Sequence, residues 1–172
     1  GVGVIGAGNY CSRFILPQVQ KDKFFSLKSL SSSQGISSSF FSKKFNIESS
    51  TTNNDKILQN DDIKYVFIVS PHNLHSSQII TALKNKKKIF VEKPLAINID
   101  QLSNIKESYK ELIKQGNENF LMMGYNRRYS ILSEIAKKNL EHLGQPCAIN
   151  YNINSGFIDN KSWIQDKDIG GG

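Results

Sequence analysis

The chain has 172 residues, enough for one full domain and part of a second, and 38% of them are hydrophobic, so a real core is expected and wholesale disorder is not. The formal net charge is +7, but the densest basic run (Lys84, Lys86, Lys87 and Lys88) lies beside a predicted turn, where a solvated helix end explains it more simply than nucleic-acid binding. No apolar run is long enough to span a membrane, and no known nucleic-acid-binding pattern accompanies the charge, so neither partner is expected.

The first stretch predicts a phosphate cradle. A strand over residues 2–5 leads into the turn Gly6-Ala7-Gly8, and a helix is expected over residues 9–20. Gly6 allows a tight turn, Gly8 lets the backbone approach a pyrophosphate, and the helix start offers free N–H groups. Cys11 occupies the third glycine position of the usual fingerprint, so helix and strand must sit slightly further apart. The alternative is that these glycines form only a tight turn.

Strands and helices alternate as far as Gly124. Pro17 is expected to kink or restart the first helix. Strands are expected at residues 25–30, 47–50, 65–69, 88–92 and 120–123, with helices at residues 37–45, 53–58, 74–84 and 98–116 between them. The predicted buried faces are Phe40, Phe41 and Phe45 in one helix, and Leu102, Ile105, Tyr109, Leu112 and Ile113 in the last. This order predicts an α/β fold, a Rossmann-type doubly wound parallel sheet over residues 1–124.

The pattern changes after Gly124. A helix is expected over residues 130–143, and then apolar and polar residues alternate from Cys147 to Asn154, which is typical of a strand with one buried face. Residues 125–172 are therefore interpreted as the truncated start of a second α/β domain. The chain starts without methionine and stops at three glycines, so we expect it to be a fragment of a longer protein.

Ligands of such a sheet bind outside the carboxyl ends of the strands, so the residues there are the candidates for function. His72 and His75 follow the strand at residues 65–69, and their imidazoles could contact a ribose or nicotinamide or shuttle a proton. The alternative is a polar loop that caps the next helix. One His-x-x-His pair without a neighbouring cysteine or carboxylate is too few ligands, so no metal site is predicted.

Glu92-Lys93-Pro94 follows the next strand. The ammonium of Lys93 could donate to a substrate oxygen on which negative charge develops during hydride transfer. A cis Lys93–Pro94 bond is possible, because an X–Pro bond gives up only about 0.5–1 kcal/mol for it. The alternative for this triplet is an ordinary salt-bridged loop.

Four motifs in this order resemble one family. They are Gly6–Asn9, Ser70–His75, Phe90–Ala96 and Gly124–Tyr129, and together they are similar to the glucose–fructose oxidoreductase / inositol dehydrogenase / MocA (Gfo/Idh/MocA) family. Asn126–Tyr129 and the closing run from Trp163 to Gly172 look closest to its bi-domain oxidoreductase branch, in which an alcohol-dehydrogenase-like domain precedes this module. The resemblance implies a Rossmann domain, a second domain with an open antiparallel sheet, NAD or NADP as cofactor, and a sugar, inositol or nucleotide-sugar substrate.

The resemblance also implies the site residues. Lys93 carries the catalytic role, and Arg127 belongs to the family's arginine region. The predicted cofactor-binding residues are Gly6, Gly8, Asn9, Tyr10, Ser32, Ser33, Ser70, Pro71, His72, His75, Glu92, Lys93, Pro94 and Arg128. The family's acid–base histidine comes from the second domain beyond a glycine-rich turn, so this chain alone is expected to bind cofactor without turnover.

Two points stay open in the sequence. Ser31, Ser32 and Ser33 follow the second predicted strand. An acid at this position would favour NAD and an arginine would favour NADP, whereas hydroxyl groups can bind the ribose of either cofactor. The predicted function is hydride transfer between nicotinamide and a sugar-like alcohol, and the alternative is a non-catalytic nucleotide-binding or regulatory module. Two distant cysteines, Cys11 and Cys147, suit a reducing compartment, so a cytoplasmic location is expected, with homo-oligomers possible through the second domain.

Overall fold

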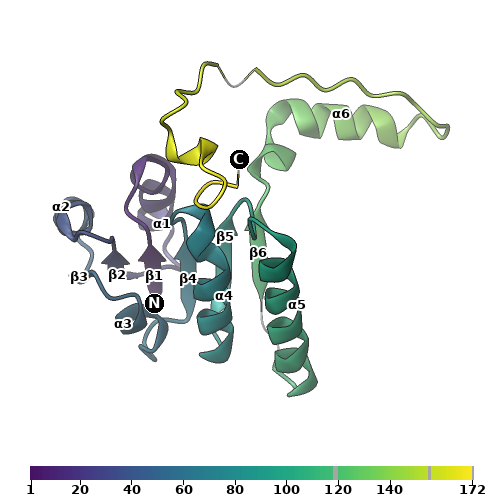
Figure 1. The fold of residues 1–172 in the computed structure, drawn as a ribbon. Helices are drawn as coiled ribbons and strands as arrows, with labels where there is room; N and C mark the ends of the chain where they lie inside the picture. Colours follow the sequence, from purple (N-terminus) through teal and green to yellow (C-terminus); the bar gives the residue numbers. More distant parts are fainter. Residues whose placement is uncertain (118–119, 155, 172) are drawn as a thin grey trace.

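The computed structural model describes residues 1–117, 120–154 and 156–171. Within these residues one parallel sheet has the strand order β3-β2-β1-β4-β5-β6 (Figure 1). Its strands are β1 (Val2–Ile5), β2 (Leu27–Ser31), β3 (Ser49–Thr51), β4 (Tyr65–Ile68), β5 (Lys88–Glu92) and β6 (Leu121–Gly124). This is the strand order of a doubly wound Rossmann sheet, so the predicted fold class is confirmed. The order reverses between β1 and β4, which is where such sheets bind ligands.

Helices cover both faces of the sheet. The helical segments of the described ranges are the π-helical turn η1 (Cys11–Ile15), α1 (Leu16–Lys21), α2 (Ile36–Lys44), α3 (Asp55–Leu58), α4 (His75–Lys84), α5 (Ile99–Lys114) and α6 (Ile131–Glu141), with short 3₁₀ turns η2 (His72–Leu74), η3 (Asn126–Tyr129) and η4 (Trp163–Gln165). One apolar cluster joins the sheet to α3, α4 and α5, and a second joins it to η1 and α1. Strand β1 serves both, because Ile5 packs in the first cluster while Val2 and Val4 pack in the second. None of the helices in the described ranges is long and apolar enough to cross a membrane.

The first helix changes its winding before the proline. The N–H of Leu16 donates to the carbonyl of Cys11, a π-type bond, and Pro17 stands in the first turn of α1, where its missing N–H costs no hydrogen bond. The predicted kink or restart at Pro17 is confirmed. Cys11 is buried in the second apolar cluster, and burial raises the pKa of its thiol to about 12. It therefore fills the third glycine position of the turn as a small apolar group.

Two predicted helix faces are only partly correct. Phe40 is 61% exposed, while α2 buries Ser38 and Ser42. The small polar β3 lies beside α2, and Ser42 Oγ donates to the Ser49 carbonyl at 3.4 Å, so hydroxyl groups and not aromatic rings line this contact. In α5 the buried members of the predicted stripe are Ile105 and Leu112, while Leu102 and Ile113 are exposed.

The prediction of a solvated basic run before β5 is wrong for one of its four lysines. Lys87 is only 4% exposed, and its ammonium donates to the carbonyl of Asn60 at 2.6 Å and to that of Ile63 at 2.8 Å. It is therefore an anchor for the turn that leads into β4, and not part of a solvated helix end. Lys84, Lys86 and Lys88 are exposed, as predicted.

The predicted strand over Cys147–Asn154 is wrong. These residues are exposed and adopt no strand, because no other described segment lies alongside to complete a ladder. The preceding α6 has no buried residue and extends away from the sheet (Figure 1). The domain boundary near Gly124 stays a prediction.

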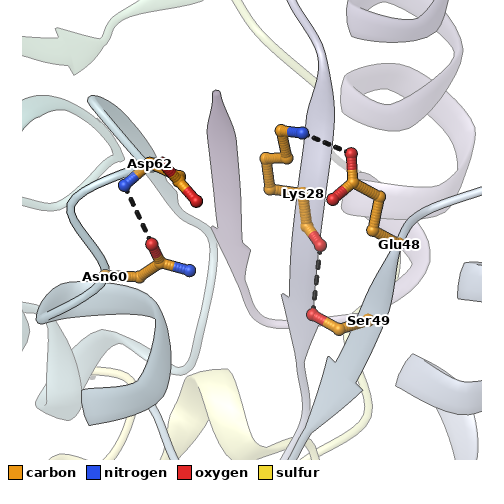
Figure 2. A network of polar contacts seen from close by, with 5 residues as sticks. All are labelled: Lys28, Glu48, Ser49, Asn60 and Asp62. Carbon is orange, nitrogen blue, oxygen red and sulfur yellow. Dashed lines mark hydrogen bonds and ion pairs between the residues drawn. The ribbon is translucent and has the colours of Figure 1, made fainter.

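A polar network stands at the amino ends of the strands (Figure 2). Lys28 forms an ion pair with Glu48, and Ser49 Oγ donates to the Lys28 carbonyl at 3.1 Å. The hydrogen bond to Glu48 raises the pKa of Lys28. In the turn before β4, the N–H of Asp62 donates to Asn60 Oδ1 at 2.9 Å. These contacts hold β2 and β3 together at the amino edge of the sheet, and the candidate functional residues lie at the opposite, carboxyl edge.

Candidate functional site

The turn after β1 contains two glycines with different tasks. Gly6 has φ +105°, and a Cβ there would lie 2.6 Å from the carbonyl carbon of Val69, so the fold itself requires glycine. A Cβ at Gly8 would meet nothing within 4 Å. Folding therefore places no demand on Gly8, and its backbone is open to the space outside the sheet.

That space is a cavity of about 580 Å³, which we call the serine cavity. It extends from the Gly6–Gly8 turn to the end of β2 and is also lined by the loop after β4. Its lining includes Gly6, Gly8, Ser32, Ser33, Ser70, Pro71 and Trp163. Six of the predicted cofactor residues therefore meet here, across the point where the strand order reverses.

A second cavity of about 510 Å³, the lysine cavity, lies at the ends of β5 and β6. It is lined by Tyr10, Ser70, His72, Glu92, Lys93, Arg127, Arg128 and Trp163, among others. Lys93 is exposed at its rim, and within the described part of the chain its ammonium has no hydrogen-bond or ion-pair partner. The Lys93–Pro94 bond is cis. The cavity thus contains a cation that is free to contact a ligand.

Asn126 connects three strand ends beneath the lysine cavity. Its Nδ2 donates to Tyr10 Oη at 2.6 Å and to Glu92 Oε1 at 2.8 Å. Partial burial, and then the hydrogen bond and charge of Glu92, raise the pKa of Tyr10, which stays a phenol. Sequence reasoning selected Tyr10 and Glu92 but missed Asn126, although its position directly after β6 is the signal that pointed to the arginines beside it.

His75 is a support beneath the site. It is fully buried, and its ring nitrogens lie 2.7 Å from the Pro94 carbonyl and 2.9 Å from the Ser70 carbonyl. Burial lowers the pKa of this imidazole against the raising effect of the two carbonyls. His75 therefore ties the loop after β4 to the loop after β5. Of the predicted cofactor residues, Asn9, His75 and Pro94 line neither cavity.

The end of the chain returns to this edge of the sheet, shown in yellow in Figure 1. The N–H of Asn73 donates to the Ile169 carbonyl at 3.0 Å, and His72 Nδ1 donates to the Gly170 carbonyl at 2.8 Å. The rings of His72 and Trp163 meet edge-to-face at 4.8 Å. Trp163 lines both cavities, and sequence reasoning missed it as a site residue because nothing local links it to His72.

The two cavities make a two-part site along one edge. The part near Gly8 offers open backbone and hydroxyl groups, which suit phosphate and ribose, and the other part offers an ammonium and two guanidinium groups. In the described ranges no group of three or more His, Cys, Asp or Glu side chains could hold a metal ion.

Several known proteins are similar to this chain in sequence or in fold. An uncharacterized oxidoreductase of Bacillus subtilis is 30% identical over 127 residues, which is 74% of this chain and 36% of that protein. The scyllo-inositol 2-dehydrogenase (NAD(+)) of the same organism is 33% identical over 95 residues, 53% of this chain and 26% of that enzyme. The crystal structure of apo scyllo-inositol dehydrogenase from Lactobacillus casei has a TM-score of 0.71 at 26% identity, covering 81% of this chain and 40% of that one. The chain thus spans less than half the length of these relatives.

The family profile described as the oxidoreductase family with the NAD-binding Rossmann fold matches residues 1–120, which is most of the chain. The resemblance drawn from the four motifs is therefore confirmed. The chain belongs to the Gfo/Idh/MocA family of oxidoreductases and contains its NAD-binding Rossmann domain.

Proposed function

We propose that the chain holds a nicotinamide cofactor across the serine and lysine cavities and that, in the full-length protein, it serves hydride transfer to or from a sugar-like alcohol. The supporting observation is the open backbone at Gly8 on one side and the unpaired ammonium of Lys93 on the other, at the same sheet edge. When bound, the cofactor supplies the hydride acceptor or donor, and the side chains around it supply position and charge.

The chain's own residues divide this work. The N–H groups after Gly8 and the start of the first helix hold phosphate oxygens, and Ser33 and its neighbours surround the distal ribose. Lys93 donates a hydrogen bond to the substrate oxygen and stabilises the negative charge that develops there. We place the proton-accepting base outside residues 1–171, because His75 is buried and His72 is hydrogen-bonded to Gly170.

The substrate class rests on the relatives. Those that are named include inositol dehydrogenases of Bacillus subtilis and Thermotoga maritima, and their substrates are polyols. Arg127 and Arg128 line the lysine cavity and can donate to hydroxyl oxygens of such a substrate. The same proposal includes membership of the bi-domain branch and homo-oligomers that form through the second domain. It also includes a cytoplasmic location, which suits a chain with two free cysteines.

The test has a binding arm and a turnover arm. The chain should enhance the fluorescence of NADH or NADPH on titration. In the full-length protein, Lys93→Ala should lower kcat by about 10²–10³-fold while cofactor affinity changes little, because the ammonium acts on charge that appears only in the transition state. Lys88→Ala, at the other end of β5, is the matched control.

Unchanged turnover in Lys93→Ala would contradict the catalytic role. Cofactor binding by a full-length protein that turns over no polyol would instead favour the alternative, a nucleotide-binding regulatory module.

A further inference from the structure

The end of β2 distinguishes the two possible cofactors. In Rossmann domains an acid at this position accepts hydrogen bonds from the ribose hydroxyls of NAD and repels the 2′-phosphate of NADP. The described residues that line this part of the serine cavity are uncharged and mostly hydroxyl- or amide-bearing: Ser31, Ser32, Ser33, Ser37, Thr52 and Asn54. No carboxylate is among the described residues that line the cavity, so none of their side chains carries a negative charge that would repel a phosphate.

The hydroxyl groups in this wall are not equivalent. Ser31 Oγ donates to Asn54 Oδ1 at 2.7 Å. Ser32 Oγ accepts from the N–H of Ser38 at 3.2 Å and donates to Ser38 Oγ at 2.9 Å, so it is committed to the start of α2. Ser33 and Ser37 are exposed to the cavity, and their hydroxyl groups have no partner in the described part of the chain. Two donors therefore remain for a ligand.

One acidic and one basic side chain lie in hollows next to the serine cavity, so the uncharged residues that line the cavity decide which cofactor it favours. Asp55 and Lys56 lie in separate hollows on either side of Thr52, and neither lines the serine cavity. Lys56 has no ion-pair partner among the described residues. An anion at Ser33 therefore meets hydroxyl groups in direct contact, and neither of these two charged side chains lines the wall that it would touch.

We propose that Ser33 and Ser37 accept the 2′-phosphate of NADP and that the chain prefers NADP to NAD. The inference rests on the proposed cofactor site and goes beyond it by assigning the cofactor. Hydroxyl donors and an absent carboxylate favour the phosphate ester, while an NAD ribose finds no acid to hold its two hydroxyl groups.

The experiment compares four ligands on the 172-residue chain. NADPH and NADH are titrated by nicotinamide fluorescence, and 2′,5′-ADP and 5′-AMP are titrated as competitors that carry or lack the 2′-phosphate. NADPH and 2′,5′-ADP should bind about tenfold or more tightly than NADH and 5′-AMP. Their affinity should also fall more steeply with salt, because more charge is neutralised.

Ser33→Asp is the decisive variant, since its carboxylate would face the 2′-phosphate. It should reverse the preference, weakening NADPH by about tenfold or more while NADH is unchanged or improved. Ser39→Asp adds the same charge to an exposed position of α2 outside the cavity and should leave the ratio of the two affinities unchanged.

The outcomes separate the two claims. Equal or tighter binding of NADH in the unaltered chain overturns the assignment of NADP but leaves the cofactor site intact. An unchanged ratio in Ser33→Asp overturns the role of Ser33. A chain that binds neither dinucleotide contradicts the proposed function itself, and the assignment falls with it.

Discussion

Gly6 and Gly8 allow the roles of the turn in folding and in binding to be separated. Alanine at Gly6 must adopt φ near +105° and place its Cβ 2.6 Å from the Val69 carbonyl atoms, and these atoms belong to the backbone and cannot move aside cheaply. The left-handed conformation alone costs about 1–2 kcal/mol, and the contact adds to it. We therefore expect Gly6→Ala to lower the free energy of unfolding by about 3 kcal/mol or more.

Alanine at Gly8 meets open space and no positive φ. Replacing glycine at such a position restricts the unfolded chain, so Gly8→Ala should leave stability unchanged or raise it by up to about 1 kcal/mol. Its methyl group, however, points into the space that a pyrophosphate would occupy. The affinity for NADPH and NADH should therefore fall by about tenfold or more.

Urea denaturation followed by circular dichroism measures the first effect, and nicotinamide fluorescence titration measures the second. The reasoning is refuted if Gly8→Ala binds both dinucleotides as tightly as the unaltered chain. In that case Gly6-Ala7-Gly8 is only a tight turn, the alternative that the sequence left open.

Two buried polar side chains give further predictions. His75→Ala removes the buried imidazole between the carbonyls of Ser70 and Pro94, so the carbonyl that accepts its ring N–H loses its donor, and it should cost about 2–4 kcal/mol of unfolding free energy, measured by denaturation against the milder His72→Ala. Burial lowers the pKa of folded His75 below the value of about 6.5 that it has in the unfolded chain. Below that pH the unfolded chain therefore protonates this imidazole more readily than the folded protein does. Stability should therefore decline as the pH falls below about 6.5, and this part of the pH dependence should be absent in His75→Asn. Lys87→Met leaves the carbonyls of Asn60 and Ile63 without their donor and should cost about 1–3 kcal/mol, while Lys84→Met at the exposed end of α4 should change stability by less than about 0.5 kcal/mol; equal effects would contradict the anchoring role.

Local sequence rules were sufficient where local structure decides the outcome. The strand, glycine turn and helix at the start, and Lys93 directly after β5, are read from neighbouring residues, and a parallel sheet then brings its strand ends to one edge. The errors concern residues whose surroundings come from distant segments. The alternation from Cys147 to Asn154 is a strand pattern with no ladder to join, and Lys87 is buried because carbonyls some two dozen residues earlier accept hydrogen bonds from its ammonium. Trp163 lies at the site because the end of the chain contacts Asn73 and His72, which are some ninety residues away in the sequence.

The position of Trp163 couples two parts of the chain that are remote in sequence. The segment from Trp163 to Gly171 is held on the sheet by a few contacts, chiefly those of Asn73 and His72, yet its indole borders both cavities. A dinucleotide that fills both would touch the indole on two sides, so thermodynamic linkage would add its binding free energy to the docking of the segment. If the site bound no ligand while the segment was undocked, a ligand concentration 100 times Kd would stabilise the docked segment by about 2.7 kcal/mol.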